Sequence, residues 1–387
     1  MAGIYFHIPF CKQACHYCNF HFSTTLDLKD EMISAMINEI MLAKVSHYIE
    51  YLEEVDTIYF GGGTPSLLSA GEIKKLLAAV YQKFEVNGKP EITLEVNPDD
   101  INEIKLSEWK LAGINRLSIG VQSFKNEDLE WMNRAHNAVQ ALHSIYLIKD
   151  AGFQNISVDL IYGTPTLSHD DWEKNVQTIV DLEVPHVSCY ALTVEANTAL
   201  QKMIRLKKKT DIESEKQAFQ FLLLINWLEV AGYEHYEISN FAKPGFRSKH
   251  NSSYWQGKPY IGIGPSAHSF NGNSRRWNVS NNALYIQSMQ KNIIPFEEEI
   301  LSEVQKLNEY IMTSLRTVEG IDLDLVKEKF GEGKKQKLLI ASGKWGLNSK
   351  IKNENDKIIL TKEGKLFADG IAADLFFEET KVYGKLL

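Results

Sequence analysis

Three cysteines near the start of the chain are the strongest chemical signal in the sequence. Cys11, Cys15 and Cys18 follow the spacing Cys-x3-Cys-x2-Cys. Thiolates hold iron–sulfur clusters, and the cubane form uses one thiolate for each of its four irons. Three ligands would leave one iron open to a substrate or cofactor. A structural zinc site is the alternative, with His16 or His21 as the fourth ligand.

The remaining cysteine usage and the apolar runs indicate where such a site would operate. Cys189 stands alone in a chain of 387 residues, which is unlike a small secreted disulfide scaffold. We expect it to be a buried small apolar residue. The start of the chain lacks the basic region and cleavage site of a signal peptide, and the longest apolar run, 219–233, is too short to span a bilayer. These features predict a cytoplasmic protein with no transmembrane segment, and they leave peripheral membrane contact open.

The composition is that of a folded acidic protein. Hydrophobic residues make up 44% and charged residues 24% of the chain, which is ordinary for a globular protein. The formal net charge of −8 argues against a general nucleic-acid binder, because such a protein needs a basic face.

Short β-rich runs alternate with helical periodicity up to about residue 235, and these elements must position the cysteines. The sequence predicts strands at 3–8, 57–60, 92–96, 116–120, 156–161 and 187–192, and helices at 29–52, 71–84, 103–111, 139–151 and 170–182. Helical returns between strands indicate a parallel sheet, and right-handed crossovers favour a curved one. We therefore expect an α/β fold containing a partial (β/α)6 barrel.

Polar residues fall where such a sheet would place a site. Active sites lie at the carboxyl ends of parallel strands. The cysteines follow the first predicted strand, the run Gly61-Gly62-Gly63-Thr64-Pro65 follows the second, and Glu95 closes the third. Gln122 follows the fourth strand and Asp159 lies in the fifth. We expect these side chains to surround one cavity.

The chain changes character after residue 235. Residues 236–298 form a connecting segment, rich in Gly, Pro, Asn and Ser over 241–282, that contains the run His-Asn-Ser-Ser-Tyr-Trp at 250–255. Helical periodicity returns between Ile300 and Leu315, a second helix is expected at 322–330, and a strand at 358–360. We expect domains at 1–235, 236–298 and 299–387, the last a small α+β, winged-helix-like domain. Its charges nearly balance, which favours packing or partner contact over DNA binding.

The cysteine motif, with Tyr17 before its last cysteine, resembles the signature of radical S-adenosylmethionine (SAM) proteins. The resemblance implies a 4Fe-4S cluster on Cys11, Cys15 and Cys18, whose open iron is chelated by the amino and carboxylate groups of SAM. An electron from the cluster then cleaves SAM to a 5′-deoxyadenosyl radical. The SAM-binding set that the resemblance implies is Tyr5, Tyr17, Gly62, Gly63, Thr64, Glu95, Gln122, Arg134 and Asp159.

A narrower resemblance covers essentially the whole chain. The segments 4–11, 61–65, 117–124 and 159–163 resemble the oxygen-independent coproporphyrinogen III oxidase family, which contains true oxidases and heme chaperones. Three features favour the chaperone subgroup. Few residues precede Cys11, Phe20 stands where the oxidases carry another cysteine, and the run at 250–255 matches the H-N-x-x-Y-W motif that the chaperones are thought to use for heme.

The resemblance therefore implies heme as a third ligand. His250 is the leading candidate for contact with the iron, and Tyr254 and Trp255 could flank the porphyrin. On the residues alone, a loop-capping histidine and packed aromatics stay open, and the same holds for His268. We expect a heme chaperone that passes heme to an unidentified acceptor protein, and a homodimer stays open. The alternatives are a coproporphyrinogen III oxidase and a radical SAM enzyme with another substrate.

Overall fold

The computed structural model describes residues 2–43 and 54–379. The chain divides into two compact units. The first unit contains residues up to 235 together with 239–253 and 258–298, and the second contains 236–238, 254–257 and 299 onward.

Six parallel strands form the centre of the first unit, as the sequence predicts. They are β1 (Ala2–Ile8), β2 (Val55–Gly62), β3 (Val86–Val96), β4 (Arg116–Gln122), β5 (Asn155–Tyr162) and β6 (His186–Ala191). Each strand pairs in parallel with the next one along the chain. All six carboxyl ends therefore lie along one edge of the sheet.

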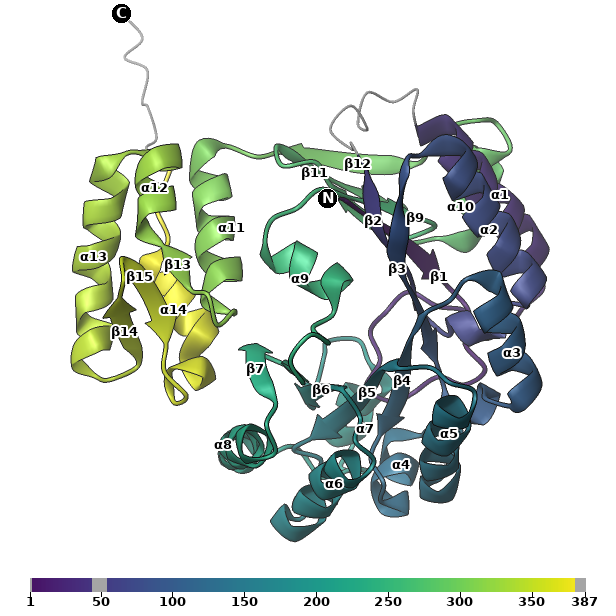
Figure 1. Ribbon diagram of the computed structural model, residues 1–387, viewed down its shortest axis with the longest axis horizontal. Coiled ribbons are helices and arrows are strands. Elements are labelled where there is room, and N and C mark those ends of the chain that lie inside the picture. Colours follow the sequence, from purple (N-terminus) through teal and green to yellow (C-terminus); the bar gives the residue numbers. More distant parts are fainter. Residues whose placement is uncertain (1, 44–53, 380–387) are drawn as a thin grey trace, which may run out of the picture. The chain divides into compact units, whose positions relative to one another are not determined.

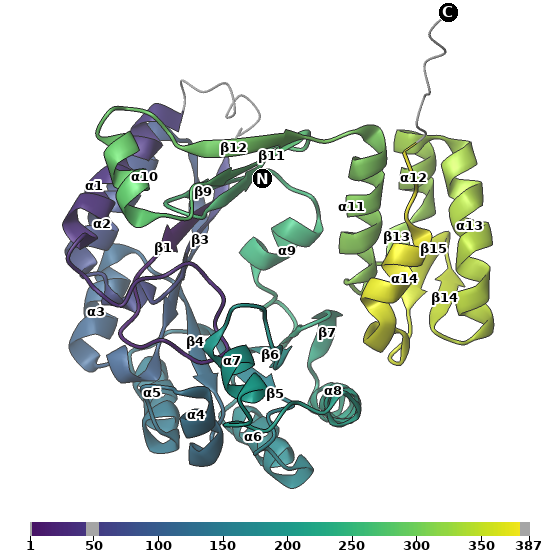
Figure 2. The same cartoon turned by 180° about the vertical axis from the view of Figure 1, so that it is seen from behind.

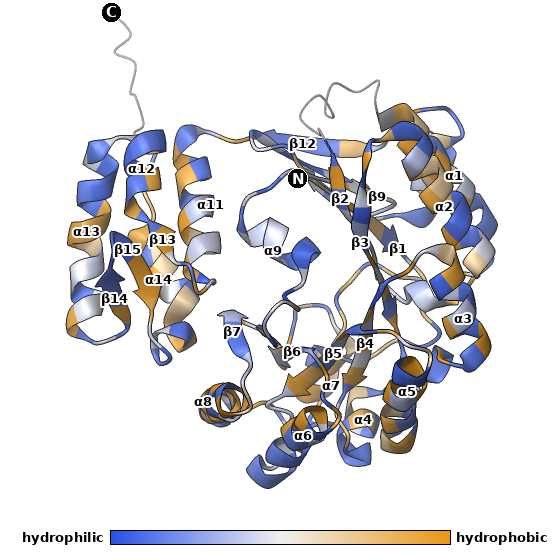
Figure 3. Ribbon diagram, viewed as in Figure 1, coloured by the Kyte–Doolittle hydropathy of each residue, from blue (hydrophilic) through white to orange (hydrophobic). Residues whose placement is uncertain are grey.

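Helices connect these strands and cover the outer face of the sheet (Figures 1 and 2). They are α1 (Lys29–Ala43), α2 (Ala70–Lys83), α3 (Glu103–Ala112), α4 (Asn126–Met132), α5 (Ala138–Asp150) and α6 (His169–Asp181). Ser69 and Asn137 close capping boxes at the starts of α2 and α5, which explains why those helices begin there. In Figure 3 several of these helices carry hydrophobic and hydrophilic stripes, the pattern of helices with one buried face.

The first unit contains helices that the sequence does not predict. The helix α4 follows β4, and α7 (Ala199–Arg205) and α8 (Ser214–Val230) follow β6. The predicted helix at 29–52 is present as α1 up to Ala43, and residues 44–52 lie outside the described part of the chain. Both α4 and α7 have only seven residues, too few for a clear helical period.

The segment after residue 235 extends the same sheet at both edges. It contains β7 (Glu234–Glu237), β8 (Asn240–Ala242), α9 (Lys249–Trp255), β9 (Tyr260–Ile263), β10 (His268–Phe270), β11 (Ser274–Asn278), α10 (Asn282–Met289) and β12 (Phe296–Ile300). The strand β9 pairs in parallel with β1, and β8 pairs antiparallel with β6. A Cβ on Gly262 would lie 2.1 Å from the carbonyl oxygen of His268, so a residue without a side chain is needed where β9 and β10 meet.

The second unit is a small α+β module, and it contains the two helices and the strand that the sequence predicts at 300–315, 322–330 and 358–360. It contains α11 (Glu303–Leu315), β13 (Ile321–Asp322), α12 (Leu323–Phe330), α13 (Glu332–Leu347), β14 (Ile351–Glu354), β15 (Lys357–Leu360) and α14 (Ala368–Leu375). Its core includes Leu307, Ile311, Val326, Ile358 and Ile371. The helix α13 was not predicted, because Gly343 and Gly346 lower its intrinsic helix propensity.

The expected fold class is confirmed: a parallel α/β sheet with helical crossovers, followed by a small α+β module. No helix within residues 2–43 and 54–379 has the length and apolar character needed to cross a membrane.

Candidate functional site

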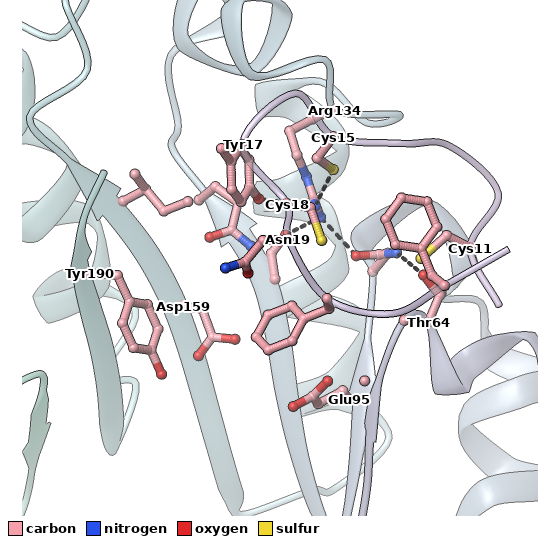
Figure 4. A pocket seen from close by; sticks show the side chains of 18 of the residues that line it. Cys11, Cys15, Tyr17, Cys18, Asn19, Thr64, Glu95, Arg134, Asp159 and Tyr190 are labelled. Atoms are coloured by element: carbon pink, nitrogen blue, oxygen red, sulfur yellow. Dashed lines mark hydrogen bonds between the residues drawn. The ribbon is translucent and has the colours of Figure 1, made fainter. Parts of the chain in front are cut away.

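A cavity of about 510 Å³ lies in the first unit, at the carboxyl ends of the parallel strands. Figure 4 shows polar side chains from several strands and from the cysteine loop pointing into it. Of the predicted site residues, those that line it are Cys11, Cys15, Tyr17, Cys18, Gly62, Gly63, Thr64, Glu95, Gln122, Arg134 and Asp159. The convergence expected from strand ends is therefore present in the structure.

The cysteine loop between β1 and α1 is tethered by backbone hydrogen bonds. The amide of Cys11 donates to the carbonyl of Ser23 at 2.9 Å, and the amide of His16 donates to the carbonyl of Met132 at 3.1 Å. The amide of Leu200 in turn donates to the carbonyl of His16 at 2.7 Å. Met132 and Leu200 lie outside this loop, so two of these bonds tie it to other parts of the chain.

The donor set fits an iron–sulfur cluster better than a single metal ion. In the described residues, no group of three His, Cys, Asp or Glu side chains is placed to hold one ion. A cubane differs, because each thiolate binds its own iron. Each histidine that could complete a zinc site uses one ring nitrogen in another contact: His16 Nδ1 lies 3.3 Å from the carbonyl oxygen of Trp131, and His21 Nε2 lies 2.8 Å from Asn282 Oδ1.

The three thiols are half-buried on the cavity wall. Burial raises the pKa of the Cys11 thiol to about 11, and it raises the pKa of Cys18 as well. Without a bound cluster, Cys11 is therefore protonated at neutral pH. A cluster bound at Cys11 would displace that proton, because the thiolate is the form that binds metal.

Arg134 brings a positive charge to the same wall. Its Nη2 donates to Asn97 Oδ1 at 2.7 Å and to the carbonyl oxygen of Gly120 at 2.9 Å, and its Nη1 donates to Cys15 Sγ at 3.2 Å. Its buried Nε has no hydrogen-bond partner among the described residues. A buried guanidinium with a spare donor beside a cavity is suited to a carboxylate ligand.

Two acids face the other side of the cavity, Glu95 from β3 and Asp159 from β5 (Figure 4). Burial, together with the charge of Asp159, raises the pKa of Glu95 to about 8. Burial likewise raises the pKa of Asp159 to about 6. Tyr59 donates a hydrogen bond to Glu95 Oε1 at 2.8 Å, and Ser118 donates to Asp159 at 3.3 Å. These carboxyl groups can accept hydrogen bonds from the hydroxyls of a bound ligand.

The glycine run after β2 packs directly against the end of β1. The amide of Gly63 donates to the carbonyl of Ile8 at 2.8 Å, and the amide of Thr64 donates to the carbonyl of Phe10 at 2.7 Å. A Cβ on Gly63 would lie 2.5 Å from the Phe10 carbonyl oxygen, so this position needs a glycine. On β4, Gln122 adopts a left-handed backbone conformation with φ of 68°, a strained geometry that is typical of functional sites.

The remaining predicted residues do not line the cavity. Tyr5 lies outside it and stacks with Tyr59, their ring centroids 6.1 Å apart. His250 is only 1% exposed, whereas Tyr254 and Trp255 are partly exposed and belong to the second unit. The heme contacts predicted for these three residues therefore stay a prediction.

Two other residues singled out by the sequence have clear positions. His268 is exposed on β10, with its ring 6.3 Å from that of Trp277. Cys189 is 2% exposed, which confirms that it is a buried small residue.

The cavity has further lining residues that the sequence does not predict. They include Asn19, Phe20, Phe22, Asn97, Ser118, Ile161, Tyr190, Leu192, Thr193 and Glu195. Asn97 and Ser118 follow or lie in predicted strands, so the strand-end rule could have found them. Tyr190 and Glu195 come from β6 and the loop after it, where the local sequence carries no recognisable motif.

Comparison with known proteins gives a consistent result. Residues 5–179 match the family model described as the radical SAM superfamily. The chain is 33% identical over 380 residues to a Bacillus subtilis protein named heme chaperone HemW, covering 96% of this chain and 98% of the relative. It is 35% identical over 328 residues to the Lactococcus lactis heme chaperone HemW, covering 84% of each chain.

A solved structure supports the same fold. The Escherichia coli coproporphyrinogen III oxidase HemN, described as a radical SAM enzyme, superimposes with a TM-score of 0.82, covering 97% of this chain and 90% of that one. Its sequence identity is 22%, so this similarity concerns the fold alone.

Proposed function

The chain belongs to the HemW family of radical SAM proteins, and we propose that it binds heme and passes it to an acceptor protein. The observation that carries this proposal is similarity along nearly the whole length of relatives named heme chaperone. It extends through the connecting segment with the run at 250–255 and into the second unit. The free cysteines suit a reducing compartment such as the cytoplasm.

Membership in the radical SAM superfamily implies a 4Fe-4S cluster and SAM. We propose that Cys11, Cys15 and Cys18 bind the cluster and that the cavity beside them receives SAM. When bound, the cluster supplies one electron to the sulfonium of SAM. Two features of this chain support the proposal: the three cysteines lie on one cavity wall, and backbone hydrogen bonds tether their loop.

The polar residues of the cavity divide into groups with different tasks in this proposal. Arg134 would hold the carboxylate of SAM with its spare Nε–H. Gly62, Gly63 and Thr64 would offer backbone groups to the amino end, and Tyr17 would cover the cluster side. Glu95, Gln122 and Asp159 would bind the hydroxyls of the ribose. Tyr5 would act on SAM indirectly, through its stacking with Tyr59.

For heme, we propose contact with the partly exposed side chains of Tyr254 and Trp255. Aromatic rings pack well against a porphyrin face. His250 could coordinate the iron only after leaving its buried position, where its ring already bonds Thr57 at 2.8 Å. The acceptor is a protein, and transfer through a dimer of this chain would fit the same proposal.

The second candidate is the oxidase, in which a radical formed from SAM attacks the propionate groups of coproporphyrinogen III. The polar lining around the cavity supports it, because these side chains could bind SAM in an oxidase as well as in a carrier. The amino acid at position 20, a phenylalanine in place of the oxidase cysteine, argues against it.

One experiment separates the two. Reconstituted protein is incubated without oxygen with SAM, a reductant and coproporphyrinogen III, and the products are analysed. A parallel sample receives heme and is passed over a size-exclusion column. The chaperone proposal predicts heme that elutes with the protein and no protoporphyrinogen. Multiple turnovers to protoporphyrinogen would reject the chaperone proposal in favour of the oxidase.

A further inference from the structure

His250 begins a connected set of side chains that ends in the cavity. Its Nδ1 lies 2.8 Å from Thr57 Oγ1, and its ring stacks on that of Tyr59, with centroids 4.9 Å apart and planes inclined by 22°. Tyr59 then donates its hydroxyl hydrogen to Glu95 at 2.8 Å. Because Glu95 lines the cavity, one aromatic ring separates the histidine from a cavity residue.

The backbone around His250 is fixed as firmly as its ring. The amides of Lys249 and His250 donate to Glu91 Oε1 at 3.0 and 3.1 Å, which ties the start of α9 to β3. A carboxylate at a helix start also interacts favourably with the helix dipole. These contacts place His250 by way of β3, while its ring is held by β2.

Glycines make room for this arrangement on both sides. A Cβ on Gly3 of β1 would lie 3.0 Å from Thr57 Oγ1 and 3.1 Å from His250 Cε1. A Cβ on Gly61 would lie 2.9 Å from Tyr59 and 3.1 Å from Glu95 Oε1. The side chains of His250, Tyr59 and Glu95 therefore pack closely against the neighbouring strands β1, β2 and β3, whose order in the sheet can be followed in Figure 1.

We propose that His250 is a positioning residue for the SAM site, which acts through Tyr59 on Glu95. The ring of His250 keeps the Tyr59 phenol in the orientation that donates to Glu95, and this bond aims the carboxyl group at the cavity. The connecting segment thereby sets the affinity of the cavity for SAM. This inference rests on the proposed function, since it takes Glu95 as a SAM contact.

The test is the affinity of cluster-reconstituted protein for SAM, measured by anaerobic equilibrium dialysis with labelled SAM. Tyr59→Phe removes the hydrogen bond to Glu95, and we expect SAM binding to weaken about tenfold. His250→Ala removes the stacked ring, and we expect about a fivefold weakening. His250→Phe keeps a ring on Tyr59, so its affinity should stay within about twofold of wild type.

The double variant distinguishes positioning from a general loss of structure. If His250 acts through the Tyr59 hydroxyl, His250→Ala adds little once Tyr59→Phe is present, because contacting residues are not additive. The matched control is His235→Ala, which removes another buried histidine stacked on an aromatic, Phe241, with centroids 4.1 Å apart. Neither His235 nor Phe241 lines the cavity, so SAM affinity should not change.

Further variants keep the test decisive. If His250→Ala does not fold, Thr57→Val removes the hydroxyl partner of the histidine and should weaken SAM binding about threefold. Unchanged SAM affinity in folded His250→Ala, or fully additive losses in the double variant, would overturn the proposal. A loss of heme binding in His250→Ala with SAM affinity unchanged would overturn it in favour of a heme ligand.

Glu95→Gln separates this proposal from its premise. If Glu95→Gln binds SAM with wild-type affinity, Glu95 is not a SAM contact, and the proposed role of His250 is rejected with that premise. If Glu95→Gln weakens SAM binding while His250→Ala does not, the SAM site stands and the positioning role alone is rejected.

Discussion

Substitution of Arg134 should affect SAM affinity much more than the free energy of unfolding. The described partners of Arg134 are an amide oxygen, a carbonyl oxygen, a thiol and a phenol, and none of them is a carboxylate. The buried guanidinium can therefore gain a directly bonded anion when an anionic ligand binds. We predict that Arg134→Met weakens SAM binding strongly and changes the stability of the ligand-free protein little.

The magnitudes follow from these contacts. A hydrogen bond to a charged group contributes about 1.5–3 kcal/mol, so losing the bond to the SAM carboxylate should weaken binding about 10- to 100-fold. In the ligand-free protein, Arg134→Met loses hydrogen bonds to Asn97 and Gly120, each worth about 1 kcal/mol. It also removes the desolvation cost of the charge, which acts in the opposite direction. We therefore expect the free energy of unfolding to change by no more than about 1 kcal/mol.

The assay pairs SAM affinity with urea unfolding of the cluster-free protein. The control is Lys125→Met, which removes a partly exposed cation bound to Asp171 at 2.9 Å, away from the cavity lining. It should lower the free energy of unfolding by at most about 1 kcal/mol and leave SAM affinity unchanged. Wild-type SAM affinity in Arg134→Met would refute the assignment of this residue to the SAM carboxylate.

Three further predictions concern the cluster, the acids and the glycine run. After reconstitution, Cys15→Ser should lack most of the iron and sulfide. Before reconstitution, its melting temperature should stay near that of wild type, because backbone hydrogen bonds tether the loop. Full iron retention would contradict this prediction. The pKa of Glu95 is raised to about 8 in the folded protein, so its contribution to stability is lost as pH rises from about 4.3 toward 8. Glu95→Gln should therefore flatten the decline in the free energy of unfolding over that range. An unchanged pH profile would contradict this prediction. Gly63→Ala should destabilise the protein by about 1–3 kcal/mol and lower its cluster content, because the new Cβ would lie 2.5 Å from the Phe10 carbonyl oxygen. The control Gly88→Ala, whose Cβ would have no atom within 4 Å, should do neither. Equal unfolding midpoints for the two variants would contradict the close approach at Gly63.

The sequence predicted the cavity residues that lie where strand and motif coincide. Glu95 and Gln122 lie at the ends of strands and Asp159 lies within one, and parallel pairing brings their side chains to one cavity. Arg134 was found differently, through the family resemblance alone. Its loop has no periodicity that would aim it at the cysteines.

The surroundings of His250 could not be predicted from local sequence. Its neighbours are Gly3 of β1, Thr57 and Tyr59 of β2, and Glu91 of β3, all of which lie far from it in the sequence. The space that Gly3 leaves beside the His250 ring likewise cannot be predicted until the pairing of β1 with β2 is known.

The most direct test of the proposed function is an anaerobic heme titration of cluster-reconstituted wild type, followed by the Soret band. The account predicts saturation near one heme per chain, with weaker binding in Tyr254→Ala and Trp255→Ala and the same stoichiometry in His250→Phe. The absence of saturable heme binding by the wild type would contradict the chaperone proposal and leave the oxidase as the better candidate.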